Sequence, residues 1–173
     1  MGRFAFRASP SPERSACSLP EVAFNEFDFE GTFSRTRDGA QLWLTLNDVS
    51  EPATFDGQVA RSERSAPRSF SSCRLNASGG LCQESSSLRE SLAVAFLSRS
   101  QNEALGGACP PNALKEGIPE TAPDGGTVTP PGTETGRFDA LRACGELEDV
   151  VVPGADCVCA PCRLVYAVTG VRK

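Results

Sequence analysis

The sequence predicts an all-β protein, an antiparallel sandwich or partly closed barrel that is stapled by disulfides. Apolar and polar residues alternate with a period of two in most segments that are long enough to judge, as they do in half-buried strands. The chain has 173 residues and eight cysteines, an even number that suits four bridges. One long segment rich in Pro and Gly interrupts the alternation. We therefore expect about six to eight strands in one domain, with one long loop.

A β-hairpin is predicted at residues 27–46. Apolar or small residues occupy every second position in residues 27–33 and again in residues 42–46. Between these runs lies Asp38-Gly39, a dipeptide that tolerates the positive φ angles of a tight turn. This hairpin is the strongest local prediction in the chain.

The domain map follows from where periodicity is present. Residues 1–19 are predicted to be a flexible lead, because Ala8-Ser9-Pro10-Ser11-Pro12 has no periodicity, and residues 20–173 are predicted to form a single β domain. A third strand is expected at residues 54–59, because turn signals occur at Asn47-Asp48 and Glu51-Pro52.

Residues 62–87 are rich in Ser, Arg and Gly and predict a surface loop. Cys73 and Cys82 bracket a turn sequence within it, and their spacing suggests that they pair with each other. We name no other pairing, because eight cysteines allow 105 connectivities.

Residues 88–97 allow two interpretations. Ser87 and Glu90 could form a helix capping box, whereas the alternation of apolar residues fits a strand that is buried on both faces. We favour the strand. Beyond it, a short helix is predicted to begin near Ser100 and to end at Gly106-Gly107.

The long loop is predicted at residues 109–136, which contain six Pro and five Gly. This composition opposes both helix and strand pairing, so the segment is interpreted as a spacer, with a binding loop as the alternative. Alternation returns in residues 138–152 and 163–171. The chain is therefore expected to end in strands.

The charge argues against nucleic-acid binding. The formal net charge is −5 and the isoelectric point is near 4.9, whereas phosphate contacts require a surplus of Lys and Arg. The one basic stretch, residues 61–74, is interpreted as a solvated loop or strand face, with an anionic ligand site as the alternative. No run of apolar residues approaches the length of a membrane-spanning helix.

The chain contains no His. This absence excludes Ser-His-Asp and Cys-His catalytic sites and every metal site that uses imidazole. We therefore expect no cofactor and no enzymatic activity of these classes.

The cysteine count points to an oxidising compartment and so to an extracytoplasmic location. The first residues contradict this in part, because residues 1–14 lack the apolar region of an export signal. Ser15-Ala16-Cys17 matches the end of a lipoprotein cleavage box, although Arg14 stands where that box has Leu. Location is thus predicted from the cysteines alone.

The cysteines themselves carry two competing hypotheses. In the favoured one, all eight form disulfides, namely Cys17, Cys73, Cys82, Cys109, Cys144, Cys157, Cys159 and Cys162. In the alternative, Cys157, Cys159 and Cys162 bind zinc with Cys144 or Cys109 as the fourth thiolate, in an intracellular module. The CxPC sequence at residues 159–162 resembles a redox motif, but only 11 residues follow it and they do not predict a helix.

Two pairs of carboxylates could support a third hypothesis, a hydrolase. Asp28 with Glu30, and Glu146 with Glu148, each lie on one face of a predicted strand. The polar faces of half-buried strands produce such pairs by default, so we prefer that interpretation. Trp43 could stack on a sugar if it is exposed, but core or cross-strand packing is the more usual role.

Four segments together resemble uncharacterised secreted proteins and lipoproteins of myxobacteria: residues 37–44, 55–59, 104–110 and 142–147. The likeness covers most of the chain after Ser15. It implies a cell-envelope or extracellular location and implies no catalytic activity. The expected function is therefore that of a non-catalytic structural or binding protein outside the cytoplasm, with a protein of the envelope or the extracellular space as a possible partner.

Overall fold

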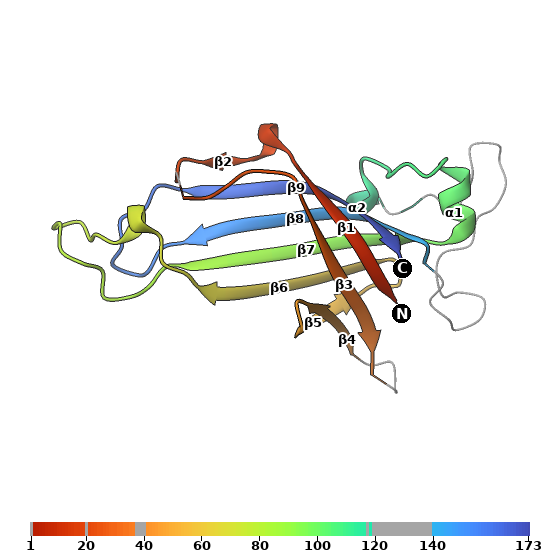
Figure 1. The fold of residues 1–173 in the computed structure, drawn as a ribbon, viewed down its shortest axis with the longest axis horizontal. Helices are drawn as coiled ribbons and strands as arrows, with labels where there is room; N and C mark the ends of the chain where they lie inside the picture. Colours follow the sequence, from red (N-terminus) through yellow and green to blue (C-terminus); the bar gives the residue numbers. More distant parts are fainter. Residues whose placement is uncertain (1, 20, 37–40, 117, 119–139) are drawn as a thin grey trace.

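Eight antiparallel strands close into a barrel in the computed structural model, which describes residues 2–19, 21–36, 41–116, 118 and 140–173. The neighbours around the barrel are β1-β3-β4-β5-β6-β7-β8-β9, and β9 pairs again with β1 (Figure 1). A short strand, β2, lies on β9 beside the barrel. The elements are β1 (Arg3–Pro10), η1 (Pro12–Arg14), β2 (Ala16–Cys17), β3 (Phe27–Arg35), β4 (Leu42–Leu46), β5 (Val49–Phe55), β6 (Val59–Pro67), η2 (Ser71–Cys73), β7 (Ser87–Leu97), α1 (Arg99–Ala104), α2 (Ala113–Glu116), β8 (Arg142–Val152) and β9 (Cys162–Arg172). The predicted all-β, disulfide-linked fold is confirmed.

The barrel is long and flattened. The four strands β6 to β9 run side by side, and β1 and β3 cross over them (Figure 1). The aromatic rings of Phe4 and Phe33 reach across the interior to Phe96 on β7, with ring centroids 5.4 and 5.0 Å apart. The space between the crossing strands is therefore filled by side chains at this end of the barrel.

The first strand corrects the predicted flexible lead at residues 1–19. Residues 3–10 form β1, which pairs with β3 on one side and β9 on the other. Phe4 and Phe6 are 0% and 2% exposed, and they alternate with the outward-facing Arg3 and Arg7. The alternation was present in the sequence, but it is short and is followed by Pro10 and Pro12, which disguise it.

Phe6 fits because glycines face it from both neighbouring strands. It lies opposite Gly170 of β9, where an added Cβ would come within 2.4 Å of the Phe6 ring. On the other side, a Cβ at Gly31 of β3 would lie 3.1 Å from the same ring. Phe29 stacks on the ring with centroids 4.9 Å apart. The missing side chains thus make room for one large ring where the barrel closes.

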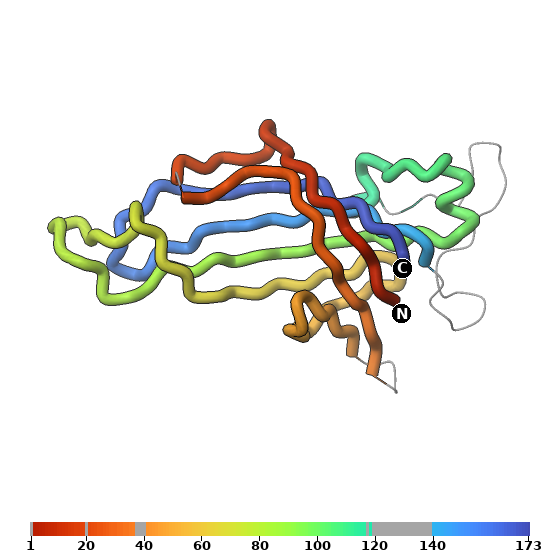
Figure 2. The backbone as a smooth tube through the Cα atoms, in the orientation of Figure 1, coloured from red at the N-terminus to blue at the C-terminus, as the bar shows by residue number. Residues whose placement is uncertain are grey.

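Closure also brings the two ends of the chain together. The backbone N–H of Lys173 donates to the carbonyl oxygen of Arg3 at 2.9 Å. The tube in Figure 2 shows both ends at the same side of the molecule. The sheet is thus sealed along β1 and β9 from the middle of the barrel to the termini.

A second apolar cluster lies outside the barrel, under the helices. Val59, Ala95 and Leu97 of β6 and β7 pack with Ala113 of α2 and with Ile118. The short helix α1 begins with a capping box, in which Ser98 Oγ accepts from the N–H of Gln101 and Gln101 Oε1 accepts from the N–H of Ser98. The predicted short helix is confirmed, with its first cap two residues earlier than expected.

Several predicted elements are confirmed and others are corrected. Residues 88–97 are a strand, as favoured, and so are the two predicted C-terminal segments. The turn predicted at Asn47-Asp48 is present, and both residues adopt positive φ angles of 48° and 64°. The predicted turn at Glu51-Pro52 and strand at residues 54–59 are wrong, because β5 continues to Phe55 and the turn falls at Gly57.

The two predicted loops also differ from the structure. Residues 62–67 belong to β6, so the predicted loop at residues 62–87 is shorter than expected. Within the predicted loop at 109–136, residues 113–116 form α2, whereas residues 117 and 119–136 lie outside the described residues. The predicted Asp38-Gly39 turn also lies outside them.

Candidate functional site

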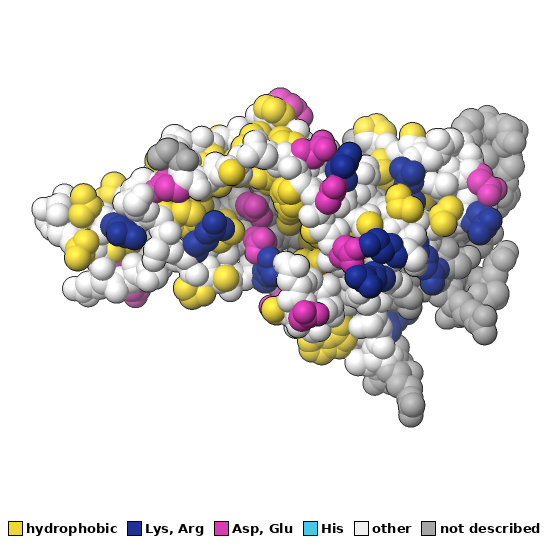
Figure 3. All heavy atoms as spheres, in the orientation of Figure 1, with side chains coloured by type: hydrophobic (Ala, Val, Ile, Leu, Met, Phe, Trp, Pro, Cys, Tyr) yellow, Lys and Arg dark blue, Asp and Glu magenta, His cyan; other side chains and the backbone are white. Residues whose placement is uncertain are grey.

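The candidate site is a cavity of about 290 Å³ inside the barrel. It lies between the crossing strand β3 and the long strands β6 to β8, and Figure 3 shows the surface hollowed there, with acidic and hydrophobic side chains in the hollow. The residues that line it are Phe27, Asp28, Phe29, Glu30, Leu44, Leu46, Asn47, Glu51, Ser62, Arg64, Glu90, Leu92 and Leu147. The cavity is open to solvent at one end and apolar over most of its wall.

A row of charged side chains lies at inward positions of three neighbouring strands, and two of them, Arg64 and Glu90, line the cavity. Arg64 of β6 lies opposite Glu90 of β7, and Glu90 lies opposite Asp149 of β8. The Arg64 Nε donates to Glu90 Oε2 at 2.6 Å, and the two side chains are only 30% and 23% exposed. This bond raises the pKa of Arg64 further above its ordinary value. The pair is partly desolvated, so it holds its geometry better than a surface ion pair would.

Asp149 is left without a cationic partner of its own. Its Oδ1 atom is buried and accepts no hydrogen bond from the described residues. Burial is the main cause that raises the pKa of Asp149 to about 6, and the negative charge of Glu90 raises it further; Arg64 and Arg68 act in the opposite direction. A carboxyl group in this position changes its charge within the physiological range of pH.

Tyr166 of β9 lies within reach of the charge of Asp149. Its hydroxyl donates to the carbonyl oxygen of Ala23 at 3.4 Å, and its pKa is raised by burial and by the charge of Asp149. Phe24 and Phe27 pack edge-on against its ring, with centroids 5.3 and 5.2 Å away. Aromatic rings therefore surround the acidic end of the row.

Sequence reasoning missed this row, although a signal existed. Glu90 shares its strand face with Leu88 and Leu92, and Asp149 shares its face with Leu147 and Val151. A charged residue at an inward position of an alternating strand is the detectable sign of a polar group in a barrel interior.

The carboxylates that were proposed as catalytic are held by cations on the outer face. Asp28 accepts from Arg7 Nε at 2.9 Å, and Glu148 accepts from Arg163 Nε at 2.9 Å. Glu30 pairs with Arg3 and Lys173, and Glu146 pairs with Arg14. The pKa values of Asp28, Glu30 and Glu148 are lowered, first by hydrogen bonds from these cations. Such groups stay ionised and do not suit an acid that must donate a proton.

Two further predicted features are Trp43 and the basic stretch at residues 61–74. Trp43 lies half-buried on the outer face of β4, opposite Ser34 and Pro52, which fits cross-strand packing. The basic stretch at residues 61–74 does not form one surface, because Arg61 pairs with Asp56 outside the barrel whereas Arg64 points inward. Neither feature forms a separate binding site.

The eight cysteines form four disulfides: Cys17–Cys162, Cys73–Cys159, Cys82–Cys157 and Cys109–Cys144. The suggested Cys73–Cys82 pairing is therefore wrong. Each of these two residues bonds instead to the loop before β9, because residues 73–82 and 157–159 lie side by side at one end of the barrel. Four disulfides indicate an oxidising environment outside the cytoplasm.

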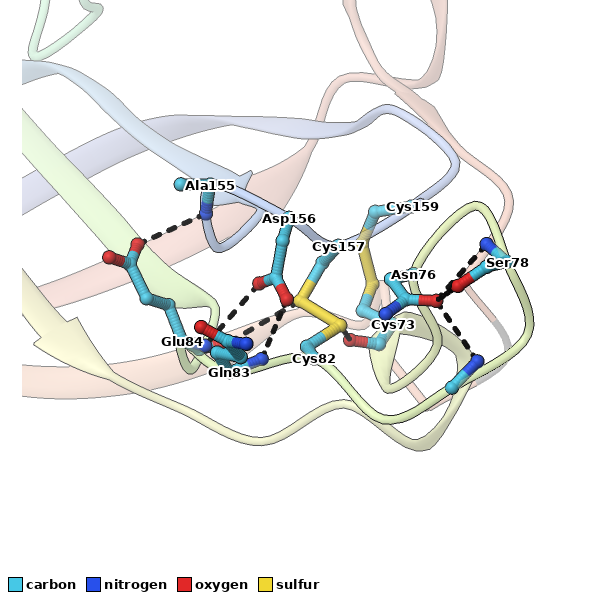
Figure 4. Close-up of a disulfide and its surroundings, with 11 residues drawn as sticks. Cys73, Asn76, Ser78, Cys82, Gln83, Glu84, Ala155, Asp156, Cys157 and Cys159 are labelled. Atoms are coloured by element: carbon cyan, nitrogen blue, oxygen red, sulfur yellow. Dashed lines mark hydrogen bonds between the residues drawn. A yellow bond between two sulfur atoms is a disulfide. The ribbon is translucent and has the colours of Figure 1, made fainter.

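The disulfide pairing also corrects the alternative zinc site. Cys144, Cys157, Cys159 and Cys162 belong to four different bridges, so none offers a thiolate. Figure 4 shows Asp156 beside the Cys82–Cys157 bridge, where its carboxylate accepts from the backbone N–H of Gln83 at 2.8 Å. Within the described part of the chain, this is the only close group of three possible metal ligands, and two of its members are joined to each other.

Comparison with known proteins adds no family. No family model matches the chain, and no curated protein matches it. In the part of the chain that the structure describes, no helix is long and apolar enough to cross a membrane. The site must therefore be interpreted from its own geometry.

We expect the variant Asp149→Asn to gain stability relative to the native protein as the pH rises from about 4 to about 7. The pKa of Asp149 is about 6 in the folded protein, whereas its ordinary value of 3.8 applies to the unfolded chain. Between these two values the folded state binds more protons than the unfolded state, so the native protein loses stability as the pH rises. Asn does not titrate. Because solvent screens part of the charge of Asp149, the difference in unfolding free energy between the variant and the native protein should grow by about 1–2 kcal/mol over this range.

Urea unfolding of both proteins across this range measures the effect. The ion pairs on the outer face are common to both proteins, so their pH dependence cancels in the difference. A difference in unfolding free energy that stays constant with pH would contradict the assignment.

The cysteine assignment predicts opposite responses to a reductant and a chelator. Reduction should lower the melting temperature strongly, because each bridge contributes about 2–4 kcal/mol by restricting the unfolded chain. A chelator should have no effect. Thermal melts with each reagent, together with thiol counting, test this. Stoichiometric zinc and eight free thiols in the denatured protein would restore the zinc hypothesis.

Proposed function

We propose that this protein is a non-catalytic binding protein of the cell envelope or the extracellular space, and that it holds one small, mostly apolar molecule inside its barrel. The observation that carries the proposal is the cavity of about 290 Å³. Its size lies near the lower end of small-molecule sites, roughly 300–1,000 Å³. An eight-stranded barrel has an interior that side chains either just fill or leave open for one small ligand.

The wall of the cavity has the composition of such a site. Six of its side chains are apolar: Phe27, Phe29, Leu44, Leu46, Leu92 and Leu147. Seven polar or charged side chains also line the cavity, and among these Ser62 and the Arg64–Glu90 pair can fix the orientation of a ligand.

The disulfides support the proposed location. Bridges form and persist in oxidising compartments, and the four here link segments that are 35 to 145 residues apart in sequence. A catalytic role has less support. The chain contains no His, and the predicted acid–base carboxylates are engaged by Arg and Lys.

A neutral dye whose fluorescence rises in apolar surroundings tests the proposal. We expect N-phenyl-1-naphthylamine to bind saturably with one site per chain. Ser62→Trp should weaken binding at least about tenfold, because Ser62 faces the cavity and the indole would fill it. The matched control is Ser65→Trp, which lies on the exposed, outward face of the same strand.

The two variants separate the cavity from the surface. The control should bind the dye as the native protein does. Absence of saturable binding by the native protein, or equal loss in both variants with a retained β spectrum, would contradict a ligand site inside the barrel.

A further inference from the structure

The charges that face the cavity do not balance. Glu51 and Glu90 line the cavity, and Asp149 lies next to Glu90 at an inward position of β8, just beyond the lining residues. Arg64 is the only guanidinium among the described residues that line the cavity. Asp28 and Glu30 also border the cavity, but their charges are answered outside it by Arg7, Arg3 and Lys173. The interior therefore has an excess of negative charge.

The one guanidinium among the described lining residues, that of Arg64, is already bonded to Glu90. The neighbouring Asp149 keeps a buried oxygen atom that accepts no hydrogen bond from the described residues. A buried polar atom without a partner is costly, and a carboxylate oxygen can be satisfied by a proton or by a donor that enters the cavity.

We propose that the cavity selects small molecules that have an apolar body and a protonated amine, with the ammonium group beside Asp149 and Glu90. This inference rests on the proposed function and specifies its ligand class. The ammonium group supplies the missing donor to Asp149, and its charge offsets the excess of carboxylates.

Other ligand chemistries fit less well. An anion would meet the carboxylates of Glu51 and Glu90 on the cavity wall, where the one guanidinium among the described lining residues, that of Arg64, is already bonded to Glu90. A bare metal ion needs several ligand atoms close together, and these acids do not form such a group. An apolar amine also matches the aromatic side chains of the wall, because Phe27 and Phe29 line the cavity and aromatic rings attract cations.

Three probes with one tail and different head groups test the inference: n-octylamine, 1-octanol and octanoate. Titration calorimetry at about pH 7.5 and about 0.15 M salt keeps the amine protonated and screens surface charges. We expect octylamine to bind at least about tenfold more tightly than octanol, and octanoate to bind most weakly.

The outcomes distinguish the inference from the proposed function. Octanol or octanoate binding as tightly as octylamine would overturn the ligand class and leave a binding cavity in place. If none of the three probes binds while the neutral dye still binds, the ligand class is likewise overturned and the binding cavity remains. Failure of the dye as well would overturn the proposed function and the inference with it.

Two variants assign the selectivity to a residue. Asp149→Asn keeps the size of the side chain and should reduce octylamine affinity about tenfold while octanol affinity stays the same, which also shows that the cavity is intact. The matched control, Glu148→Gln, changes the adjacent outward carboxylate and should preserve the preference. An unchanged preference in Asp149→Asn would overturn the assignment.

The preference for octylamine over octanol should also fall as the pH is lowered from about 7.5 to about 5, because Asp149 then takes up a proton. The charged and titratable groups that act on Asp149 are Glu90 on β7, Arg64 on β6, Arg68 just beyond β6 and Tyr166 on β9. Of these, Arg64 and Tyr166 have pKa values raised above their ordinary values, so neither changes its charge in this interval. A preference that is independent of pH would contradict the role of Asp149.

Discussion

The pairing of β1 with β9 is the constraint on which the rest of the structure depends. Seven residue pairs join these strands, and without them the sheet would have two long edges and an exposed row of Phe side chains. Closure removes both edges and buries the rings of Phe4 and Phe6. It also shapes the cavity, because β3, which is paired with β1, forms one of the cavity walls.

The disulfides have a different structural role from that of the barrel core. They attach segments that lie outside the barrel: β2, which only two residue pairs join to β9, the loops around Cys73 and Cys82 at one end, and the helical segment through Cys109. Regular hydrogen bonding and apolar packing therefore account for the barrel, whereas the bridges account for its irregular additions. Neither the packing of the barrel nor the disulfides account for the row of charged side chains in the interior. Removing these charges from water costs free energy, and this cost is our reason to infer a ligand.

Sequence reasoning predicted the fold class, the later strands and the use of every cysteine, because alternation and an even cysteine count are local signals. It missed β1, since a six-residue alternation beside two prolines looked like an irregular lead. Disulfide pairing depends on which loops meet in space, so Cys73–Cys159 could not be derived from spacing. The charged residues Arg64, Glu90 and Asp149 are far apart in sequence and meet only through strand register. Their inward positions could nevertheless be inferred from the alternation around them.

Hydrogen exchange of the amides in residues 3–10 tests the central claim that the sheet closes around the cavity. Both sides of β1 are paired, so its amides should exchange as slowly as those of β8, residues 142–152. Mass spectrometry of peptides from the native protein measures both segments in one experiment. Exchange of residues 3–10 at the rate of an unstructured chain, while residues 142–152 stay protected, would show an open sheet and contradict the account.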